Sequence, residues 1–353
     1  MDSAATGSTS QPSASTPARP RPGPSIGDVA RLAGVSAQTV SRVSNEAENV
    51  LPATRQRVLD AMEQLGYTPN RAARALRTGS FATIGVVVHR LARTGESGTV
   101  DAIVDSARRE GYTVNLVDVA SPSSDDVTAA LRRLSNQSVD GLVIVRAETT
   151  TPTSLAVPGR TPVVVADSRF VGQHPSVGAD QLAGATRAVE HLLALGHETV
   201  HLVAGPPESG PAQLRAQAWR TTLERSGRRV PEPAQGDWTA HSGYVAGVGL
   251  ARDPDVTAVF CANDEMATGV LHALHEAGRR VPQEVSVVGF DDIPLAGHLW
   301  PPLTTVRQDF EQVGAELVRL LVEQIRDGSR FVARNVVVPA PLVIRASTAP
   351  PPA

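Results

Sequence analysis

The sequence predicts two kinds of folded unit: an N-terminal all-α head of the helix-turn-helix type, and an α/β core of two subdomains with parallel sheets. Two observations carry this prediction. Between residues 25 and 66, three short helical patterns follow one another, each with its own start and stop residues. From residue 80 onward, short β-branched runs alternate with amphipathic helical patterns that end in glycine. The length of 353 residues suffices for two or three domains.

Composition excludes several classes of protein. Hydrophobic residues make up 41% of the chain, yet no apolar run approaches the roughly 20 residues that a membrane-spanning helix needs. Residues 1–24 are rich in Ser, Thr, Pro and Ala and contain no apolar stretch, so we expect a disordered leader and no secretory signal peptide. The single cysteine, Cys261, excludes an internal disulfide framework and a cysteine-based zinc site. These features predict a cytoplasmic protein without membrane contact.

The formal net charge of -3 is unevenly divided along the chain. Residues 1–24 contain two Arg and one Asp, which gives +1, and residues 25–79 contain seven Arg and five acidic residues, which gives +2. The rest of the chain therefore carries -6. This small asymmetry permits DNA binding by the N-terminal part without demanding it.

The head begins with clear helix punctuation. Ser25 and Asp28 fit a capping box before the first helical pattern, and Gly34 suits its end. Ser36 can cap the second helix, and Pro52 suits the first turn of the third. A helix, a short turn with glycine and a second helix make a helix-turn-helix.

In a helix-turn-helix, the second helix enters the major groove of DNA. Its inward face here is Val40 and Val43, and its outward face carries Ala37, Gln38, Ser41 and Arg42. Gln38 can pair with adenine and Arg42 with guanine through two hydrogen bonds each. The alternative is a small three-helix packing module whose polar residues are merely solvated.

The core should contain parallel sheets, because continuous apolar strands separated by helices are typical of βαβ units covered on both faces. Ligands of such folds bind at the carboxyl ends of the strands. The seven expected strands are residues 83–88, 112–119, 139–145, 162–166, 199–205, 257–262 and 285–290.

Longer strings carry a family resemblance. SIGDVARLAGVSAQTVSRVSN and TRQRVLDAMEQLGYTPNRAARALRTG closely resemble the head of the lactose-repressor (LacI/GalR) family, and ALGH, GDW, ANDEMATG, SVVGFDD and PPLTTVRQDF extend the resemblance through the core. It covers almost everything after residue 24. It implies a DNA-binding transcription repressor whose periplasmic-binding-protein-like core binds a small effector. The expected domains are the head at 25–68, a hinge helix at 69–79 and a two-lobed effector and dimerisation domain at 80–353.

The resemblance implies which residues contact DNA. In the head they are Ser36, Ala37, Gln38, Thr39, Ser41, Arg42, Asn45 and Thr54. Ala37 departs from the larger or polar side chain that relatives often have there, so the operator sequence stays open. In the hinge, Asn70 can cap a helix that contains Ala73, and the resemblance implies that Leu76 wedges into the minor groove and kinks the duplex. The alternative is a plain flexible linker.

The same resemblance implies an effector site for a sugar, since Arg is a rigid donor fork, Asp an acceptor pair, and an aromatic ring can face the sugar ring. Asp167 together with GDW is closest to galactoside-responsive relatives, but His89 and Arg93 match poorly, and Ala120 stands near where lactose-type relatives have an arginine. Each residue could instead have an ordinary structural role, for example Asn263 as a helix cap. The expected effector residues are His89, Arg93, Asp167, Arg215, Trp238, Asn263, Asp291, Gln308 and Phe310.

The expected partners are a pseudo-palindromic operator in double-stranded DNA, a small effector and a second copy of the chain, because one head reads only a half-site. Residues 295–300 are a candidate dimer face. The C-terminus lacks the leucine heptads with which some relatives form tetramers, so we expect a dimer. We expect no metal and no cofactor. The alternatives are a regulator of the same architecture that responds to purines or other metabolites, a sugar-binding protein without regulatory function, and an enzyme using Asp264, Asp292 or His241. GVGLAR at 247–252 lacks a dinucleotide glycine pattern and indicates helix packing.

Overall fold

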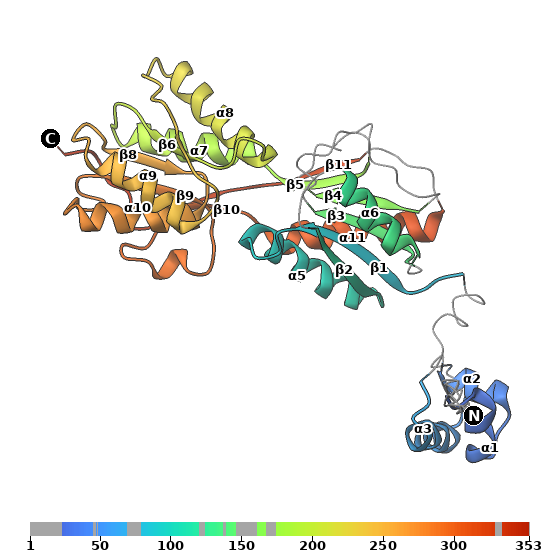
Figure 1. Cartoon of the computed structure of the whole chain (residues 1–353). Coiled ribbons are helices and arrows are strands. Elements are labelled where there is room, and N and C mark those ends of the chain that lie inside the picture. Colours follow the sequence, from blue (N-terminus) through green and yellow to red (C-terminus); the bar gives the residue numbers. More distant parts are fainter. Residues whose placement is uncertain are drawn as a thin grey trace, which may run out of the picture. The chain divides into compact units, whose positions relative to one another are not determined.

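The computed structural model describes residues 23–44, 47, 49–68, 79–119, 124–136, 139–145, 161–166, 174–328 and 334–352. The expected leader and hinge helix therefore lie almost entirely outside the described residues. Contacts divide the chain into two compact units, Met1–Thr78 and Gly79–Ala353 (Figure 1). Among the helices that the structure describes, none has the length and apolar character needed to cross a membrane.

Three helices lie in the described residues of the first unit: α1 (Ile26–Ala33), α2 (Ala37–Ser44) and α3 (Pro52–Leu65). They pack around Val29, Val40 and Val58, each fully buried. Aliphatic residues at helical spacing thus give the head its own small core, with the second helix held by its inward face. The helix-turn-helix expected from the sequence is confirmed.

Local contacts explain the ends of these helices. The Ser25 hydroxyl accepts a hydrogen bond from the Asp28 backbone N–H at 3.3 Å, and the Asp28 carboxylate accepts one from the Ser25 N–H at 2.9 Å, which completes the capping box. The Ser36 hydroxyl accepts from the Thr39 N–H at 3.1 Å at the start of α2. Gly34 ends α1 with a φ of 64°, a left-handed conformation that glycine adopts without steric cost.

The described residues of the second unit form two lobes, each built on a six-stranded sheet. The sheet of the first lobe has the order β11-β5-β4-β3-β1-β2, and all its neighbouring strands are parallel. Helices α5, α6 and α11 pack against it. The bounds are β1 Thr83–His89, α5 Thr94–Arg109, β2 Thr113–Val119, α6 Ser124–Asn136, β3 Gly141–Val145, β4 Val163–Ala166, β5 Ser176–Ala179, α11 Phe310–Asp327 and β11 Asn335–Val338.

The sheet of the second lobe has the order β12-β10-β9-β8-β6-β7, parallel except for the pair β10 and β12. Buried hydrophobic clusters line both faces of the sheet. The bounds are α7 Gln181–Ala194, β6 His201–Ala204, α8 Gly210–Arg225, β7 Ala234–Gln235, α9 Ala240–Ala251, β8 Ala258–Cys261, α10 Asp264–Glu276, β9 Ser286–Asp291, a 3-10 turn Ala296–His298, β10 Thr304–Arg307 and β12 Leu342–Val343.

The chain passes between the two lobes three times (Figure 1). It leaves the first lobe after β5, returns after β10 into α11, and leaves again after β11 into β12. The three crossover segments lie side by side, since the Asp180 N–H donates to the Val338 carbonyl at 2.8 Å and Gln181 contacts Gln308. Neither lobe is therefore a continuous stretch of sequence.

All seven strands expected from the sequence are present, and five more were not expected. The unexpected ones, β5, β7, β10, β11 and β12, contain two to four residues. Residues 247–251 lie in α9, as helix packing requires: a Cβ at Gly247 would lie only 2.8 Å from the Ala273 Cβ of α10. Cys261 is fully buried, as expected for a small core residue.

Candidate functional site

A cleft of about 420 Å³ lies between the two lobes of the core, at the carboxyl ends of β1, β8 and β9. The first lobe contributes Arg90, Leu91, Ala92, Arg93, Thr94, Gly95, Glu96 and Asp118 to its walls. The second lobe contributes Arg215, Asp237, Trp238, Thr239, Asn263, Glu265 and Asp291. Strand ends and helix starts thus bring charged and hydrogen-bonding groups together from distant parts of the sequence.

Arg215 is the centre of the second-lobe wall. It projects from α8, is 1% exposed, and its guanidinium lies 3.7 Å from the ring centroid of Phe290 and 5.5 Å from that of Trp238. Its Nε donates to Gln181 Oε1 at 2.8 Å, and its Nη1 donates to the Ala262 carbonyl. These contacts fix the plane of the guanidinium at the edge of the cleft.

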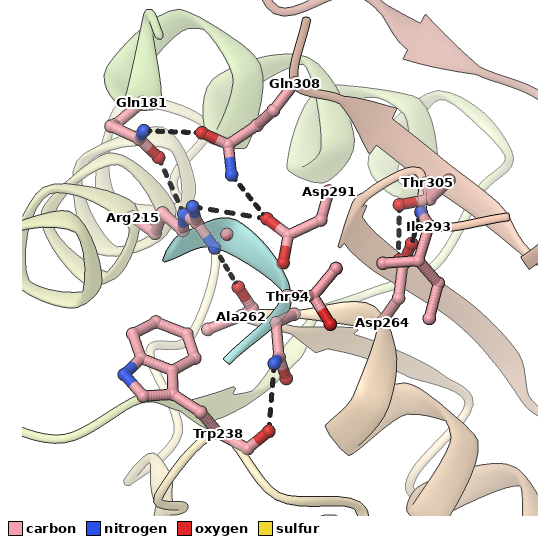
Figure 2. Close-up of polar contacts among 12 residues, drawn as sticks. Thr94, Gln181, Arg215, Trp238, Ala262, Asp264, Asp291, Ile293, Thr305 and Gln308 are labelled. Atoms are coloured by element: carbon pink, nitrogen blue, oxygen red, sulfur yellow. Dashed lines mark hydrogen bonds and ion pairs between the residues drawn. The ribbon is translucent and has the colours of Figure 1, made fainter. Parts of the chain in front are cut away.

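Asp291 faces Arg215 from the end of β9, with 3.5 Å between Oδ1 and Nη2. The same Oδ1 accepts a hydrogen bond from Gln308 Nε2 at 2.5 Å, and Gln308 Oε1 accepts one from Gln181 Nε2 at 3.0 Å. Four buried side chains therefore form a closed ring, Arg215, Gln181, Gln308 and Asp291 (Figure 2). Two of these, Arg215 and Asp291, also line the cleft.

Asn263 combines a structural and a candidate binding position. Its Oδ1 accepts from the Met266 N–H at 3.0 Å, which caps α10, and its Nδ2 donates to the Trp238 carbonyl at 3.0 Å and to Glu265 Oε2 at 2.8 Å. The helix-cap alternative is thus real, and it coexists with a place in the cleft wall.

Trp238 has an unusual backbone, with a φ of 78°, and its side chain is 8% exposed. The indole packs closely on Gly205, where a Cβ would lie 2.4 Å from the ring. Within the described part of the chain, its Nε1–H has no hydrogen-bond acceptor. A positive φ costs conformational energy for a bulky residue, so the packing around Trp238 must stabilise this backbone conformation and keep the ring in the cleft wall.

The first-lobe wall comes from the turn after β1 and the start of α5. Arg93 lies there with its Nη1 3.6 Å from Oε1 of Glu96, a carboxylate that is almost completely buried. Thr94 crosses the cleft and donates a hydrogen bond to Glu265 Oε1 of the second lobe. Phe310, at the start of α11, packs against Gly98 of α5 behind this wall.

Of the expected effector residues, the structure brings five into the cleft wall: Arg93, Arg215, Trp238, Asn263 and Asp291. Gln308 and Phe310 stand behind the wall, and His89 is buried at the end of β1 without lining the cleft. Asp167 lies outside the described residues. Sequence reasoning missed six residues of the site: Glu96, Asp118, Gln181, Asp237, Thr239 and Glu265. Of these, Asp237 and Glu265 lie within the motifs GDW and ANDEMATG, which were a usable signal.

The carboxylates considered for catalysis have structural roles. Asp264 accepts hydrogen bonds from the Ile293 N–H at 2.9 Å and from Thr305 Oγ1 at 2.5 Å; burial, with Asp291 nearby, raises the pKa of its carboxyl well above the usual value. Asp292 pairs with Arg307 and Arg345, each at 2.6 Å. Within the described residues, no group of three or more His, Cys, Asp or Glu could hold a metal ion.

The head presents a separate candidate surface on α2. Val40 and Val43 are buried, whereas Ala37, Gln38 and Arg42 are exposed. Among the other expected DNA-contacting residues, Ser36 is exposed, and three are half-buried: Thr39, Ser41 and Thr54. Asn45, Asn70, Ala73 and Leu76 lie outside the described residues.

Two family models match the chain. Residues 25–70 match a model described as bacterial regulatory proteins of the lacI family, and residues 189–348 match a periplasmic binding protein-like domain. The lactose operon repressor of Escherichia coli (strain K12) is 37% identical over 338 residues, covering 92% of this chain and 90% of that protein. The transcriptional repressor PurR of Pasteurella multocida (strain Pm70) is 32% identical, covering 91% and 98%.

Solved structures give the same result. A lac repressor dimer bound to operator and the anti-inducer ONPF has a TM-score of 0.82 at 34% identity, covering 93% of this chain and all of that one. A complex of the transcriptional regulator CelR with cellobiose has a TM-score of 0.68 at 32% identity, covering 92% and 99%. The similarity therefore extends over the head and both lobes of the core.

Proposed function

Because the chain belongs to the LacI family of bacterial regulatory proteins, we propose that it represses transcription as a homodimer on a pseudo-palindromic operator and that a sugar bound between the lobes releases it. Family membership alone makes it a DNA-binding regulator with a small-molecule effector, and not an enzyme. The operator, the homodimer, the sugar and the individual contact residues are the proposal.

The exposed face of α2 supports operator reading. Gln38 and Arg42 project from a helix whose other face is fixed by Val40 and Val43, so their backbone positions are rigid. A glutamine and an arginine with free outward ends suit bidentate contacts to adenine and guanine, each worth about 1–3 kcal/mol of discrimination. Ser36, Thr39, Ser41, Asn45 and Thr54 would add further contacts.

The observation that carries the sugar proposal is the pair Arg215 and Asp291 at the edge of the cleft. A donor fork beside an acceptor pair suits adjacent hydroxyl groups, and Trp238 offers apolar surface next to them. The volume of about 420 Å³ lies in the range of small-molecule sites. Arg93 and Glu96 on the opposite wall favour a ligand with polar groups at both ends.

The residues of the cleft favour a sugar without selecting one particular sugar. A galactoside remains a candidate through Trp238 and Asp167, but relatives of similar identity are named for lactose, purine and other regulation. The charged groups on both walls favour a hydroxylated ligand over a flat nucleobase. A purine-responsive regulator is therefore the outcome to test against.

The proposed mechanism couples the cleft to the hinge at 69–79. A ligand that binds more tightly to the arrangement of the lobes that does not bind DNA lowers operator affinity. The loss can be no larger than the ratio of the ligand's affinities for the two arrangements. The hinge would fold on the operator, with Asn70 as its cap and Ala73 in its helix, and place Leu76 in the minor groove. Leu76→Ala should then lower operator affinity and DNA bending in a permuted-site gel shift; unchanged bending would remove the wedge role.

The dimer proposal uses the surface at residues 295–300. Trp300 is 95% exposed and Leu295 51% exposed, an unusual exposure for large apolar side chains on one short segment. Trp300→Ser should shift sedimentation velocity toward the monomer at low micromolar concentration. Leu214→Ser, on α8 and 37% exposed, is the matched control that should leave the dimer intact.

A gel shift with DNA from upstream of the protein's own gene tests the whole proposal. We expect a complex with a pseudo-palindromic site that resists competitor DNA at physiological salt, and its loss on adding one member of a panel of mono- and disaccharides. Release, or tighter binding, caused only by a nucleobase would replace the sugar with a purine. Equal affinity for all sequences would refute operator reading.

Variants of the head sharpen this experiment. Gln38→Ala and Arg42→Ala should each weaken specific binding by about 1–3 kcal/mol and relax the preference at one base pair. Gln64→Ala, an exposed glutamine in the last turn of α3, is the matched control. Equal losses for Gln38 and Gln64 would argue against α2 as the reading helix.

A further inference from the structure

We propose that Gln181 is a positioning residue of the effector site, and that its side chain transmits the state of the cleft to two of the crossover segments between the lobes. It does not line the cleft itself. It acts through two neighbours: Arg215 Nε donates to Gln181 Oε1 at 2.8 Å, and Gln181 Nε2 donates to Gln308 Oε1 at 3.0 Å. This inference rests on the proposed function, since it assumes that Arg215 and Asp291 contact the ligand.

The ring of four side chains is satisfied by only one orientation of its two amide groups. An arginine only donates, so Gln181 must turn its carbonyl oxygen toward Arg215 and its amide nitrogen toward Gln308. Gln308 must then turn its own nitrogen toward the carboxylate of Asp291, as observed. The polarity runs one way from the cation to the anion, and flipping either amide would oppose two donors or two acceptors.

Because the four side chains are buried, a reversed hydrogen bond in this ring would cost much free energy. Gln181 is 3% exposed, Gln308 5%, Asp291 6% and Arg215 1%. In such surroundings a lost partner leaves a polar atom unsatisfied, which costs more than an exposed hydrogen bond is worth. The ring therefore holds the Arg215 fork and the Asp291 carboxylate in one fixed relation.

The positions of the two glutamines connect this geometry to lobe movement. Gln181 is the first residue of α7, directly after the crossover from β5, and Gln308 lies between β10 and α11 at the second crossover. Arg215 and Asp291 both belong to the second lobe. A rotation of the lobes that moves one crossover against the other must strain the bond between Gln181 and Gln308, and thereby the ligand-facing pair.

The ring itself is tested without ligand, by exchanging the amide of Gln181 and the carboxylate of Asp291 between the two positions. In Gln181→Glu, Gln308 must turn its nitrogen to the new carboxylate, which leaves its oxygen facing Asp291. In Asp291→Asn, the cation loses its carboxylate. Each single variant should lower the urea midpoint of core unfolding by about 1 M. The double variant restores one carboxylate and a complete donor order, so its midpoint should return close to that of the unaltered protein.

The ligand role is tested by calorimetric titration of the full chain with lactose and with cellobiose. Gln181→Leu should raise the Kd of whichever sugar binds by about 10- to 100-fold. Gln324→Leu removes a half-buried glutamine of α11 whose Nε2 donates to the Leu320 carbonyl at 3.2 Å, and it should leave this Kd unchanged. An unchanged Kd for Gln181→Leu would overturn the positioning role.

The two proposals fail in different ways. Additive losses in the double variant Gln181→Glu with Asp291→Asn would overturn the ring, whatever the sugar results. Restored stability together with binding of neither sugar to the unaltered protein would support the ring and exclude lactose and cellobiose as effectors. Restored stability with a raised Kd in Gln181→Leu supports both.

Discussion

Replacing Arg215 with lysine separates the charge of this residue from its shape. A lysine ammonium keeps a positive charge for Asp291, but as a single point it cannot reach both Gln181 Oε1 and the Ala262 carbonyl. Both atoms are acceptors of the present guanidinium, which is 1% exposed. The substitution therefore removes at least one of these two charge-assisted hydrogen bonds, together with the stacking on Phe290, 3.7 Å away.

The size of the effect follows from these contacts. Hydrogen bonds to a charged group contribute about 1.5–3 kcal/mol each, so losing one or both should lower the free energy of unfolding of the core by roughly 1.5 to 6 kcal/mol. That is a large part of the 5–15 kcal/mol by which domains are typically stable. Sugar binding should weaken in parallel, because the donor fork is gone.

Urea unfolding of the full chain, followed by tryptophan fluorescence, measures the loss. Arg220→Lys is the matched control on the same helix; Arg220 is exposed, and its substitution should change stability by less than about 0.5 kcal/mol. A loss below about 1 kcal/mol for Arg215→Lys would mean that charge alone matters at this position. The reasoning from donor geometry would then be wrong.

Three further predictions concern other parts of the molecule. Burial lowers the pKa of His197, so the unfolded chain takes up this proton first as the pH falls, and core stability should decline below about pH 6.5; urea midpoints that are equal at pH 7.5 and 5.5 would contradict this. Ser25→Ala removes the capping box and should cost the head about 1 kcal/mol, read from its own calorimetric transition; no change would mean that the cap is dispensable. Gly289→Ala would place a Cβ 2.1 Å from Asp264 Oδ1 and should destabilise the core by about 3 kcal/mol in urea unfolding, whereas a neutral result would show that this carboxylate moves freely.

Local patterns in the sequence were sufficient for the head and for the main strands. The capping box at Ser25 and the stop at Gly34 depend on contacts within a few residues, and the structure has both. The strand at 83–88 is a continuous apolar run, so it was visible without knowledge of its neighbours. By contrast, β5 has the sequence SVGA and is stabilised by pairing with β4 and β11, partners that only the complete fold supplies.

The candidate site was predictable where a residue follows a strong strand or belongs to a family motif. Asn263 and Asp291 were found in this way and do lie in the cleft wall. Gln181 was missed because a glutamine at the start of a helix usually indicates a solvated position. Its partner Gln308 is 127 residues away in sequence, and no local pattern encodes that contact.

The order in which the chain crosses between the lobes has a consequence for its biosynthesis. Strand β11 of the first lobe and β12 of the second both come from residues 335–343, so neither sheet can be completed before the ribosome has translated that stretch. The head at 25–68 has its own core and can fold much earlier, as domains commonly do during synthesis. A chain truncated before residue 335 would therefore have a folded DNA-binding head attached to an incompletely folded effector domain.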